Sequence, residues 1–541
     1  MPDYETFDVV VVGAGTAGTI IASRIAENGV NPSTGDRLTV GLFEAGPYHL
    51  KGGPLRPGIG DPVRRQMITN IKADETVPAK WGYDGYNLKA VGGCSLHWGS
   101  NASLPIPKDF ANWRRASNVD WTEESFEDAI EEAVRMYHVH PIDEYYGTSG
   151  VNPPEAARAR APSSGKLSTA GQMFADAAKA LGLPVNQRRN DPRERGIRGL
   201  ARINCILCGY CGGGHFCKYD SKATGLIYLK LIGESNGLNV IADAEIDHII
   251  IEKKGASPVA RGIVYTQYGE KKEARAPRVI VCCGTSGTPV LLYRSGYGPK
   301  DLLGQKVIVE NDNVGRHLDG DISSGAMDMI GLFGKDIHDE GGRSSLLVHE
   351  EGDRNKVTVS GLGGVGYTQQ YPRLRALYSV APDFGWEHKE YMKKGLKRIG
   401  SIGTGVRAPI WDKGRIGLRG EHIYRRDDPR VLGLLQKAWS VSRDIMRKVS
   451  PQPIELDDAR PQVFTIVHEV GTCRAGESRE NSVATSDFES HDIENLLLCS
   501  AGVIPNGTHT ASHMPTVSVS CYAWRRIVAN HFTRGAAPLG G

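Results

Sequence analysis

The sequence lacks any long uninterrupted apolar segment. A helix that spans a bilayer requires about 18 or more consecutive apolar residues, and no run in this 541-residue chain approaches that length. The chain also lacks an excess of charge of one sign, because 65 Lys and Arg residues against 62 Asp and Glu residues leave a net charge of +3. The first absence argues against a membrane span, and the second argues against a nucleic-acid partner. Both favour a soluble, globular chain.

The N-terminus lacks the basic stretch and the cleavage site of a secretory signal peptide, since the chain opens with MPDYETFDVVVVGAG. Of the ten cysteines, four form a cluster that is treated below. The others are scattered singly or as the pair Cys282–Cys283 among apolar residues. Buried thiols of this kind are typical of a reducing compartment. We therefore expect a cytoplasmic protein.

The segment FDVVVVGAGTAGTIIASRIAENG (7–29) joins an apolar strand to a helical pattern through a glycine turn. Gly13, Gly15 and Gly18 fit the motif G-x-G-x-x-G. In this motif the first glycine permits the tight turn, the second lets the backbone approach a pyrophosphate, and the third lets the helix pack against the strand. The segment predicts a Rossmann-like dinucleotide-binding unit.

A second strand, RLTVGLFEAGP (37–47), carries Glu44 at its end. A carboxylate in this place typically accepts a hydrogen bond from a ribose hydroxyl, about 20 residues after the glycines. The larger separation here is explained by the loop GVNPSTGDR (29–37). The alternative is a surface acid at a strand end, and the paired glycine motif favours the ribose role. NAD and FAD fit these residues equally well.

The stretch VGGCSLHWGSNASLPIPKDFANW (91–113) distinguishes the two cofactors, because it resembles the glucose–methanol–choline (GMC) flavoprotein oxidoreductases. In that family a glycine pair, here Gly92 and Gly93, lets the chain pass over the flavin. The order G-G-x-S-x-H-W is similar to pyranose oxidases and bacterial sugar dehydrogenases, in which the histidine of the His-Trp pair can carry FAD covalently. The resemblance places this linkage at His97, beside Trp98. The alternative is that His97 packs on the flavin without a bond.

Further along the chain, RVIVCCGTSGTPVLLYRSG (278–296) and NVGRHLDGD (313–321) resemble two more GMC segments. HEVGTCRAG (468–476) and the stretch 496–525 resemble the motifs near the C-terminus of GMC proteins. Within 496–525, the resemblance implies that Ser500 and Thr516 contact the cofactor. The order of these segments along the chain extends the resemblance over nearly the whole length.

Two histidines of the closing motifs stand where the family keeps its catalytic pair. His468 is the first residue of H-x-x-G-T, and His513 lies three residues before Thr516. Oxidation of an alcohol removes the hydroxyl proton while a hydride leaves for flavin N5, and a neutral imidazole suits the proton. A second polar group can hold the same oxygen and orient the C–H bond. We assign His468 as the base and His513 as its hydrogen-bonding partner, and the reverse assignment stays open.

A cysteine cluster occupies NCILCGYCGGGHFCKYD (204–220), with the spacing C-x2-C-x2-C-x5-C. Short disulfide loops are strained, so these thiols are better placed to converge on one metal centre. Iron–sulfur clusters take thiolate ligands, whereas structural zinc sites more often show two separated C-x2-C pairs. The sequence favours iron–sulfur over zinc, with unliganded thiols as a third possibility. The four proposed ligands are Cys205, Cys208, Cys211 and Cys217.

The same stretch resembles a subset of bacterial GMC flavoprotein subunits, the gluconate, glucose and fructose dehydrogenases, which add a cysteine-rich insertion. In some of them the insertion carries an iron–sulfur cluster near the flavin. The resemblance implies a three- or four-iron cluster within residues of about 200–222. It also implies a small subunit or a cytochrome-type or quinone electron acceptor. Co-export with a signal-bearing partner subunit would then be a route to the periplasm.

We therefore expect an α/β fold of the GMC type with two domains. The Rossmann-like FAD-binding domain comprises residues 1–115, 196–325 and 455–541, and the substrate-binding domain comprises 116–195 and 326–454. Alternation in NKVTVSGLGGVGYTQQY (355–371) and GRIGLRG (414–420) predicts an antiparallel sheet in the second domain.

The expected function is an FAD-dependent dehydrogenase that oxidises a secondary alcohol of a sugar, polyol or glycoside to a ketone. Its electrons would leave through the cluster to a protein or quinone. The first alternative is an oxidase that uses dioxygen, with zinc or nothing on the cysteines. The second is a non-catalytic flavoprotein subunit that relays electrons, which loss of His468 or His513 would favour; both are present.

Overall fold

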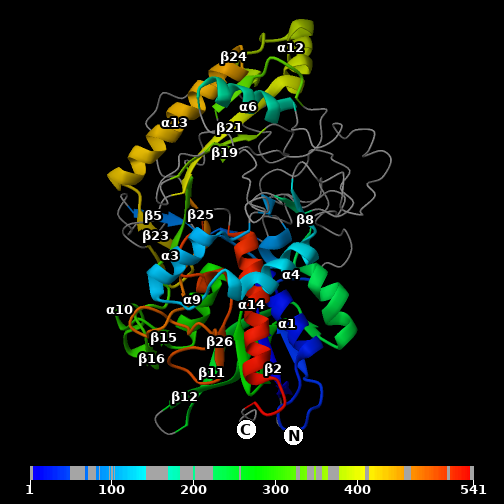
Figure 1. Ribbon diagram of the computed structural model, residues 1–541, viewed down its shortest axis with the longest axis vertical. Helices are drawn as coiled ribbons and strands as arrows, with labels where there is room; N and C mark the ends of the chain where they lie inside the picture. Colours follow the sequence, from blue (N-terminus) through cyan, green and yellow to red (C-terminus); the bar gives the residue numbers. More distant parts are fainter. Residues whose placement is uncertain are drawn as a thin grey trace.

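A five-stranded parallel sheet organises one end of the molecule in the computed structural model (Figure 1). Its strand order is β10-β3-β2-β14-β26, and every neighbouring pair is parallel. Strands β2, β3 and β14 are buried along their whole length, as expected for a sheet covered on both faces. The bounds are Asn239–Ile241 (β10), Val40–Phe43 (β3), Val9–Val12 (β2), Arg278–Val281 (β14) and Leu496–Leu498 (β26).

The structure describes residues 4–48, 68–70, 81–84, 86–96, 98, 101–102, 104–141, 169–182, 199–201, 223–254, 257–323, 329–337, 347–348, 356–362, 377–407, 414–455, 465–508 and 512–536. Of the helices in these ranges, none combines the length and the apolar character needed to cross a bilayer.

Two helices from opposite ends of the chain lie side by side against the parallel sheet (Figure 1). Helix α1 (Thr16–Asn28) follows β2, as the glycine motif predicts, and it buries ten of its residues. Helix α14 (His513–His531) closes the chain and is buried along most of its first three turns. The N-terminal and C-terminal segments therefore build one structural unit.

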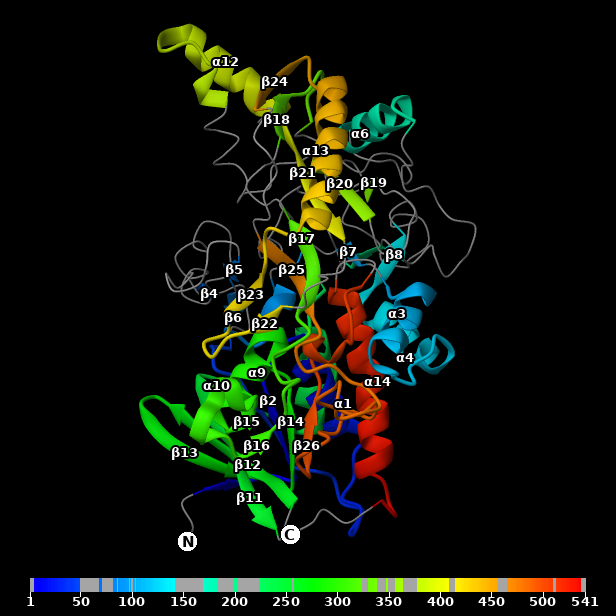
Figure 2. The same cartoon turned by 90° about the vertical axis from the view of Figure 1, so that its left-hand side faces the viewer.

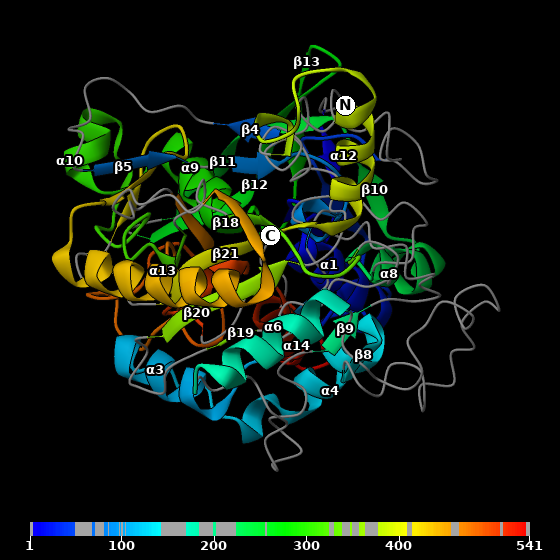
Figure 3. The same cartoon turned by 90° about the horizontal axis from the view of Figure 1, so that it is seen from above.

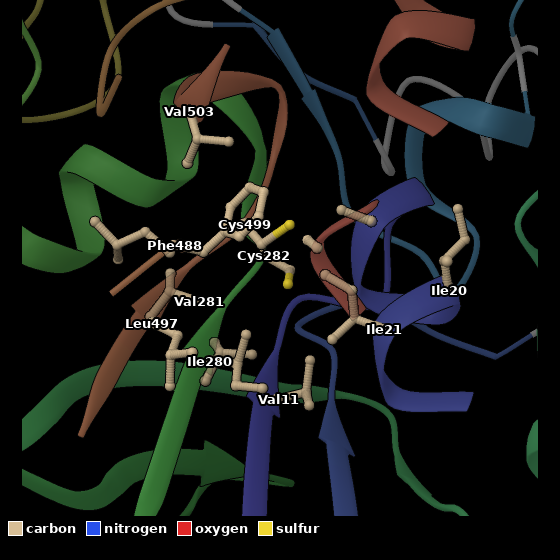
Figure 4. Close-up of a cluster of buried hydrophobic side chains, with 14 of the residues drawn as sticks. Val11, Ile20, Ile21, Ile280, Val281, Cys282, Phe488, Leu497, Cys499 and Val503 are labelled. Atoms are coloured by element: carbon tan, nitrogen blue, oxygen red, sulfur yellow. The ribbon is translucent and has the colours of Figure 1, made fainter. Parts of the chain in front are cut away.

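The core beneath these helices combines residues from three distant parts of the sequence (Figure 4). Val11, Ile280 and Leu497 come from neighbouring parallel strands, and each is at most 1% exposed. Cys282 and Cys499 pack among them as small apolar side chains, and burial raises the pKa of both thiols. Inert thiols are the result.

The other cysteines in the described ranges follow the expectation of burial only in part. Cys473 and Cys521 are buried and Cys283 is half-buried, but Cys94 is exposed, which contradicts the expectation. The reason is local: in the 3-10 turn Gly93–Leu96, the inward positions are taken by Ser95 and Leu96.

A seven-stranded antiparallel sheet forms the other end of the molecule (Figure 2). Its main order is β19-β20-β21-β17-β25; off this path, β18 pairs with β21, and β24 pairs with β18. Strand β20 lies within the predicted 355–371 segment and pairs antiparallel with β21, which confirms that part of the prediction. The predicted 414–420 segment forms β22 (Arg415–Ile416) in a separate three-stranded sheet, so its expected place in this sheet is wrong. The bounds are Leu347–Val348 (β19), Lys356–Leu362 (β20), Ile399–Arg407 (β21), Asp319–Ser323 (β17), Thr465–Val470 (β25), Met329–Leu332 (β18) and Gln452–Glu455 (β24).

Helix α13 (Pro429–Val449) covers this sheet. Its buried residues recur every three or four positions, from Val431 through Leu435 and Trp439 to Met446. The helix begins at a cap in which the Asp428 carboxylate accepts from the Arg430 backbone N–H at 2.9 Å, and the Arg430 guanidinium lowers the pKa of Asp428. Seen from this end of the molecule, α13 runs along β20 and β21 (Figure 3).

Strands β17 and β25 extend from the second sheet toward the parallel sheet, so they connect the two ends (Figure 2). The boundaries predicted from the sequence place both strands in the FAD-binding domain. The division into domains remains a prediction.

The remaining strands form smaller sheets. These are β1 (Glu5–Thr6), β13 (Glu270–Arg275), β12 (Ser257–Gln267) and β11 (Ala244–Lys254) in one sheet; β22 (Arg415–Ile416), β23 (His422–Arg425) and β5 (Trp81–Asp84); β7 (Asn101–Ala102), β9 (Gly199–Ala201) and β8 (Val139–Pro141); β4 (Ile68–Asn70) and β6 (Tyr86–Leu88); and β15 (Tyr297–Gly298) and β16 (Val309–Glu310). Further α-helices are α3 (Pro107–Ser117), α4 (Glu127–Tyr137), α6 (Thr169–Ala180), α8 (Leu226–Tyr228), α9 (Gly284–Arg294), α10 (Lys300–Leu303) and α12 (Gly385–Arg398).

Candidate active site

Two glycine segments meet at the end of β2. The backbone N–H of Gly92 donates to the Ala14 carbonyl at 2.7 Å, and a Cβ placed on Gly93 would lie 2.7 Å from the Cα of Gly15. Gly13 and Gly92 adopt φ values of +93° and +105°, which favour glycine. A side chain at Gly18 would collide with the Gly13 carbonyl, 1.8 Å away. The predicted roles of these glycines in the turn and in helix packing agree with this geometry.

The start of α1 offers a place for an anion. A Cβ at Gly15 would meet nothing within 4 Å, so this side of the turn is open. Among the described residues, no side chain caps the helix and none in its first turn is acidic. Backbone N–H groups at such a helix start bind phosphate.

Glu44 stands beside this turn, at the end of β3. Its two carboxylate oxygens accept from the N–H groups of Ala14 and Gly46, each at 2.9 Å. Burial raises the pKa of Glu44 to about 7, against the opposing effect of these hydrogen bonds. Glu44 therefore fixes the glycine turn, a role that the sequence did not predict. Its ribose role remains a prediction, and the open turn with an adjacent carboxylate fits a dinucleotide.

The segment after the glycine pair is fastened to residues 223–225. Ser95 Oγ donates to the Gly92 carbonyl at 2.5 Å and accepts from the Gly225 N–H at 3.0 Å. Trp98 Nε1 donates to the Ala223 carbonyl at 2.9 Å, and Trp98 is buried. His97, the predicted site of covalent flavin attachment, lies outside the described residues.

His513 is the first residue of α14, and its ring stacks on Trp98 with centroids 3.9 Å apart and an angle of 26°. The Tyr137 ring lies 5.8 Å from His513 on centroids and 5.9 Å from Trp98. The structure thus brings together two predicted site residues from opposite ends of the chain. Aromatic packing of this kind fixes the orientation of the imidazole.

His468 lies on β25, where its Nδ1 is 2.6 Å from Asp321 Oδ2 on β17. Its side chain is 40% exposed, whereas Asp321 is only 13% exposed. Asp321 is the last residue of the segment NVGRHLDGD (313–321), whose pattern assigns it no role. A lone acid in a sequence gives no signal for such a contact, because pairing of β17 with β25 creates it.

Ser500 and Thr516 have partners inside the protein. Ser500 caps the 3-10 turn Ala501–Val503 by accepting from the Gly502 N–H at 3.1 Å. The Thr516 hydroxyl donates to the Ser512 carbonyl at 2.7 Å. Their assignment to the cofactor remains a prediction.

A second polar cluster, which the sequence did not predict, joins residues of β25, β23 and α9. His422 Nε2 is 2.7 Å from Ser286 Oγ, and His422 Nδ1 is 3.7 Å from Glu469 Oε1. Burial lowers the pKa of His422 to about 4, so this imidazole is neutral.

The predicted metal ligands Cys205, Cys208, Cys211 and Cys217 lie outside the described residues. Within the ranges that the structure does describe, no group of His, Cys, Asp and Glu residues is arranged to hold a metal ion.

The parallel sheet and the open glycine turn define a dinucleotide-binding α/β protein, which also carries a second, antiparallel sheet. Family models described as GMC oxidoreductase match residues 7–319 with their N-terminal part and residues 382–520 with their C-terminal part. The chain belongs to the GMC oxidoreductase family, which confirms the resemblance found in the motifs. The protein is accordingly an FAD-dependent oxidoreductase that acts on CH–OH groups.

Curated relatives match over the whole chain. The oxygen-dependent choline dehydrogenase of Pseudomonas fluorescens (strain SBW25) is 23% identical, over 99% of this chain and 98% of the relative. The alcohol dehydrogenase [acceptor] of Pseudomonas putida is 22% identical, over 95% and 94% of the two chains.

Solved structures share the fold. Pyridoxine 4-oxidase from Mesorbium loti superposes with a TM-score of 0.68 at 18% identity, over 97% of this chain and 99% of the other. A formate oxidase variant from Aspergillus oryzae RIB40 gives a TM-score of 0.69 at 17% identity, over 98% and 99%.

Proposed function

We propose that the protein is an FAD-dependent dehydrogenase that oxidises a secondary alcohol of a sugar, polyol or glycoside to a ketone. In this proposal electrons leave through an iron–sulfur cluster, held by the four clustered cysteines, to a protein or quinone acceptor. FAD, when bound, supplies the acceptor for the hydride of the substrate carbon. Gly13, Gly15, Gly93 and Glu44 would hold this cofactor.

The proposal rests on how the cysteine-bearing segment is anchored. Before it, β9 pairs with β7, which directly follows the His97 region. After it, Ala223 and Gly225 are hydrogen-bonded to Trp98 and Ser95. Both ends of the segment therefore attach to the stretch that passes over the flavin in GMC proteins.

Chain length adds a bound on distance. Cys205 is four residues beyond Ala201, the last residue of β9. An extended chain advances at most about 3.6 Å per residue, so four residues can span at most roughly 14 Å. A metal centre on these cysteines would therefore be separated by only a short stretch of chain from β9, which pairs with β7, and this supports an electron exit near the flavin-side segment.

The proton chemistry falls to the two histidines. His468 would take the hydroxyl proton, because its imidazole is accessible on β25. His513, oriented by Trp98, would hold the same oxygen. We also propose a covalent link between His97 and FAD, and a small subunit or a cytochrome as the partner. The proposed location is the cytoplasm, or the periplasm after export with a partner subunit.

An oxidase is the second candidate, favoured by the names of relatives such as pyridoxine 4-oxidase. The two candidates are separated by metal analysis and turnover. We expect protein purified without oxygen to contain iron and acid-labile sulfide beside FAD, and to reduce a one-electron acceptor faster than dioxygen with an oxidisable sugar or polyol. Zinc without iron, together with rapid peroxide formation, would favour the oxidase.

A further inference from the structure

We infer that Asp321 positions His468 for catalysis by fixing its tautomer, so that Nε2 is the atom that accepts the substrate proton. The inference rests on the proposed role of His468 as the base. None of the family motifs assigns a role to Asp321.

The contact arises at an irregularity in the pairing of β17 with β25. Asp319 is opposite Val470, and Asp321 is opposite Val467, so β25 contains one extra residue over this interval. This is a β-bulge, a feature that redirects a side chain and is common beside active sites. His468 lies inside it.

The backbone of His468 is held in an unfavourable conformation. Its φ is +59°, in the left-handed region that favours glycine and that costs other residues about 1 kcal/mol or more. Such a conformation persists only where the surroundings determine it. Here the bulge directs His468 to Asp321, while the adjacent Glu469 approaches His422.

The chemistry of the pair determines which nitrogen carries the proton. An ionised carboxylate only accepts hydrogen bonds, so the 2.6 Å contact requires Nδ1 of His468 to be the donor. The neutral ring then has its lone pair on Nε2. An aspartate that fixes a histidine tautomer in this way is a recurring device in acid–base catalysis.

Strand β17 also anchors Gly507, which precedes the second histidine in the sequence. Asp319 is two residues before Asp321, so both belong to the same face of the strand. The Asp319 carboxylate is fully buried and accepts from the Gly507 N–H at 3.1 Å, six residues before His513. One strand thus contacts His468 through Asp321 and anchors Gly507 through Asp319.

The test compares Asp321→Asn with Asp336→Asn. Each change is made both in the protein that retains His468 and in the His468→Ala variant. The asparagine of Asp321→Asn would retain the shape of the side chain but present an amide that can donate to Nδ1 and place the proton on Nε2. Asp336 is an exposed carboxylate that pairs with Arg398 at 3.0 Å in the second sheet region, so its change controls for loss of one negative charge.

The first readout is independent of turnover: the rate at which diethylpyrocarbonate acylates His468, measured by peptide mass spectrometry. A hydrogen bond to a charged group biases the tautomers roughly tenfold or more. We expect Asp321→Asn to slow acylation of His468 by about that factor, whereas Asp336→Asn leaves the rate unchanged. Equal acylation in wild type and Asp321→Asn would overturn the inference.

The second readout is single-turnover reduction of bound FAD by the sugar or polyol that the enzyme oxidises. Asp321→Asn should slow it roughly 10²–10⁴-fold with little change in the substrate concentration for half-saturation. In the His468→Ala variant, Asp321→Asn should cause no further decrease in the rate of FAD reduction. An equal loss in that background would show that Asp321 acts independently of His468 and overturn the inference. A normal rate in His468→Ala alone would instead refute the proposed base.

Discussion

Substitution of Gly93 by alanine tests whether the two glycine segments form the cofactor cradle. Gly93 has a φ of +50°, and its added Cβ would lie 2.7 Å from the Cα of Gly15. The Cα of Gly15 is a backbone atom, and the backbone at position 93 fixes the added Cβ, so no flexible side chain can move to relieve the contact. The collision must displace either the open turn before α1 or the segment that passes over the flavin.

The matched control is Gly304→Ala at the end of α10. Gly304 has a nearly equal φ of +56°, but a Cβ there would meet nothing within 4 Å. Both variants place a side chain at a positive φ, which costs a non-glycine residue about 1 kcal/mol or more in the free energy of unfolding. Gly304→Ala therefore controls for a side chain at positive φ, and Gly93→Ala adds the contact with Gly15.

The assay is FAD content after purification, together with thermal unfolding before and after addition of FAD. We expect Gly304→Ala to be modestly less stable and fully loaded with FAD. Gly93→Ala should lose FAD, with an affinity at least about tenfold lower, because the displaced turn would no longer present its backbone N–H groups to the diphosphate. Equal FAD affinity in the two variants would refute the cradle. If acid precipitation shows a covalent flavin, the fraction of protein that incorporates FAD replaces the affinity.

Three further predictions concern the site residues. His468→Ala should retain FAD and slow flavin reduction about 10²–10⁴-fold, as seen in stopped-flow absorbance, and an unchanged rate would exclude it as the base. Cys208→Ser should leave single-turnover flavin reduction near normal while steady-state transfer to a one-electron acceptor fails; equal losses would mean that the cysteines support the active site. Glu44 has a pKa raised by burial to about 7, so it contributes stability below pH 4.5 that is lost as the pH rises through 7. Glu44→Gln in FAD-depleted protein should remove this component of the pH dependence of unfolding, and an identical pH profile would contradict it.

Local sequence patterns predicted the cofactor end of the fold well. The turn from β2 into α1 depends on neighbouring residues, so Gly13 and Gly18 could be assigned from spacing alone, and the structure places both as expected. The alternation that predicted β20 is equally local. The role of Glu44 was only partly predictable, because its hydrogen bond to Ala14 joins residues 30 positions apart.

The contacts that organise the candidate site join residues that are far apart in the sequence. The sequence could assign His468 by resemblance, yet its partner Asp321 lies 147 residues earlier in the chain. The pairing of β17 with β25 and the extra residue in β25 create that contact, and neither leaves a mark in composition or periodicity. A motif search finds the imidazole but leaves its tautomer undetermined. Since the proton acceptor is one particular nitrogen, the residue that decides the chemistry of His468 is the one that sequence spacing could not identify.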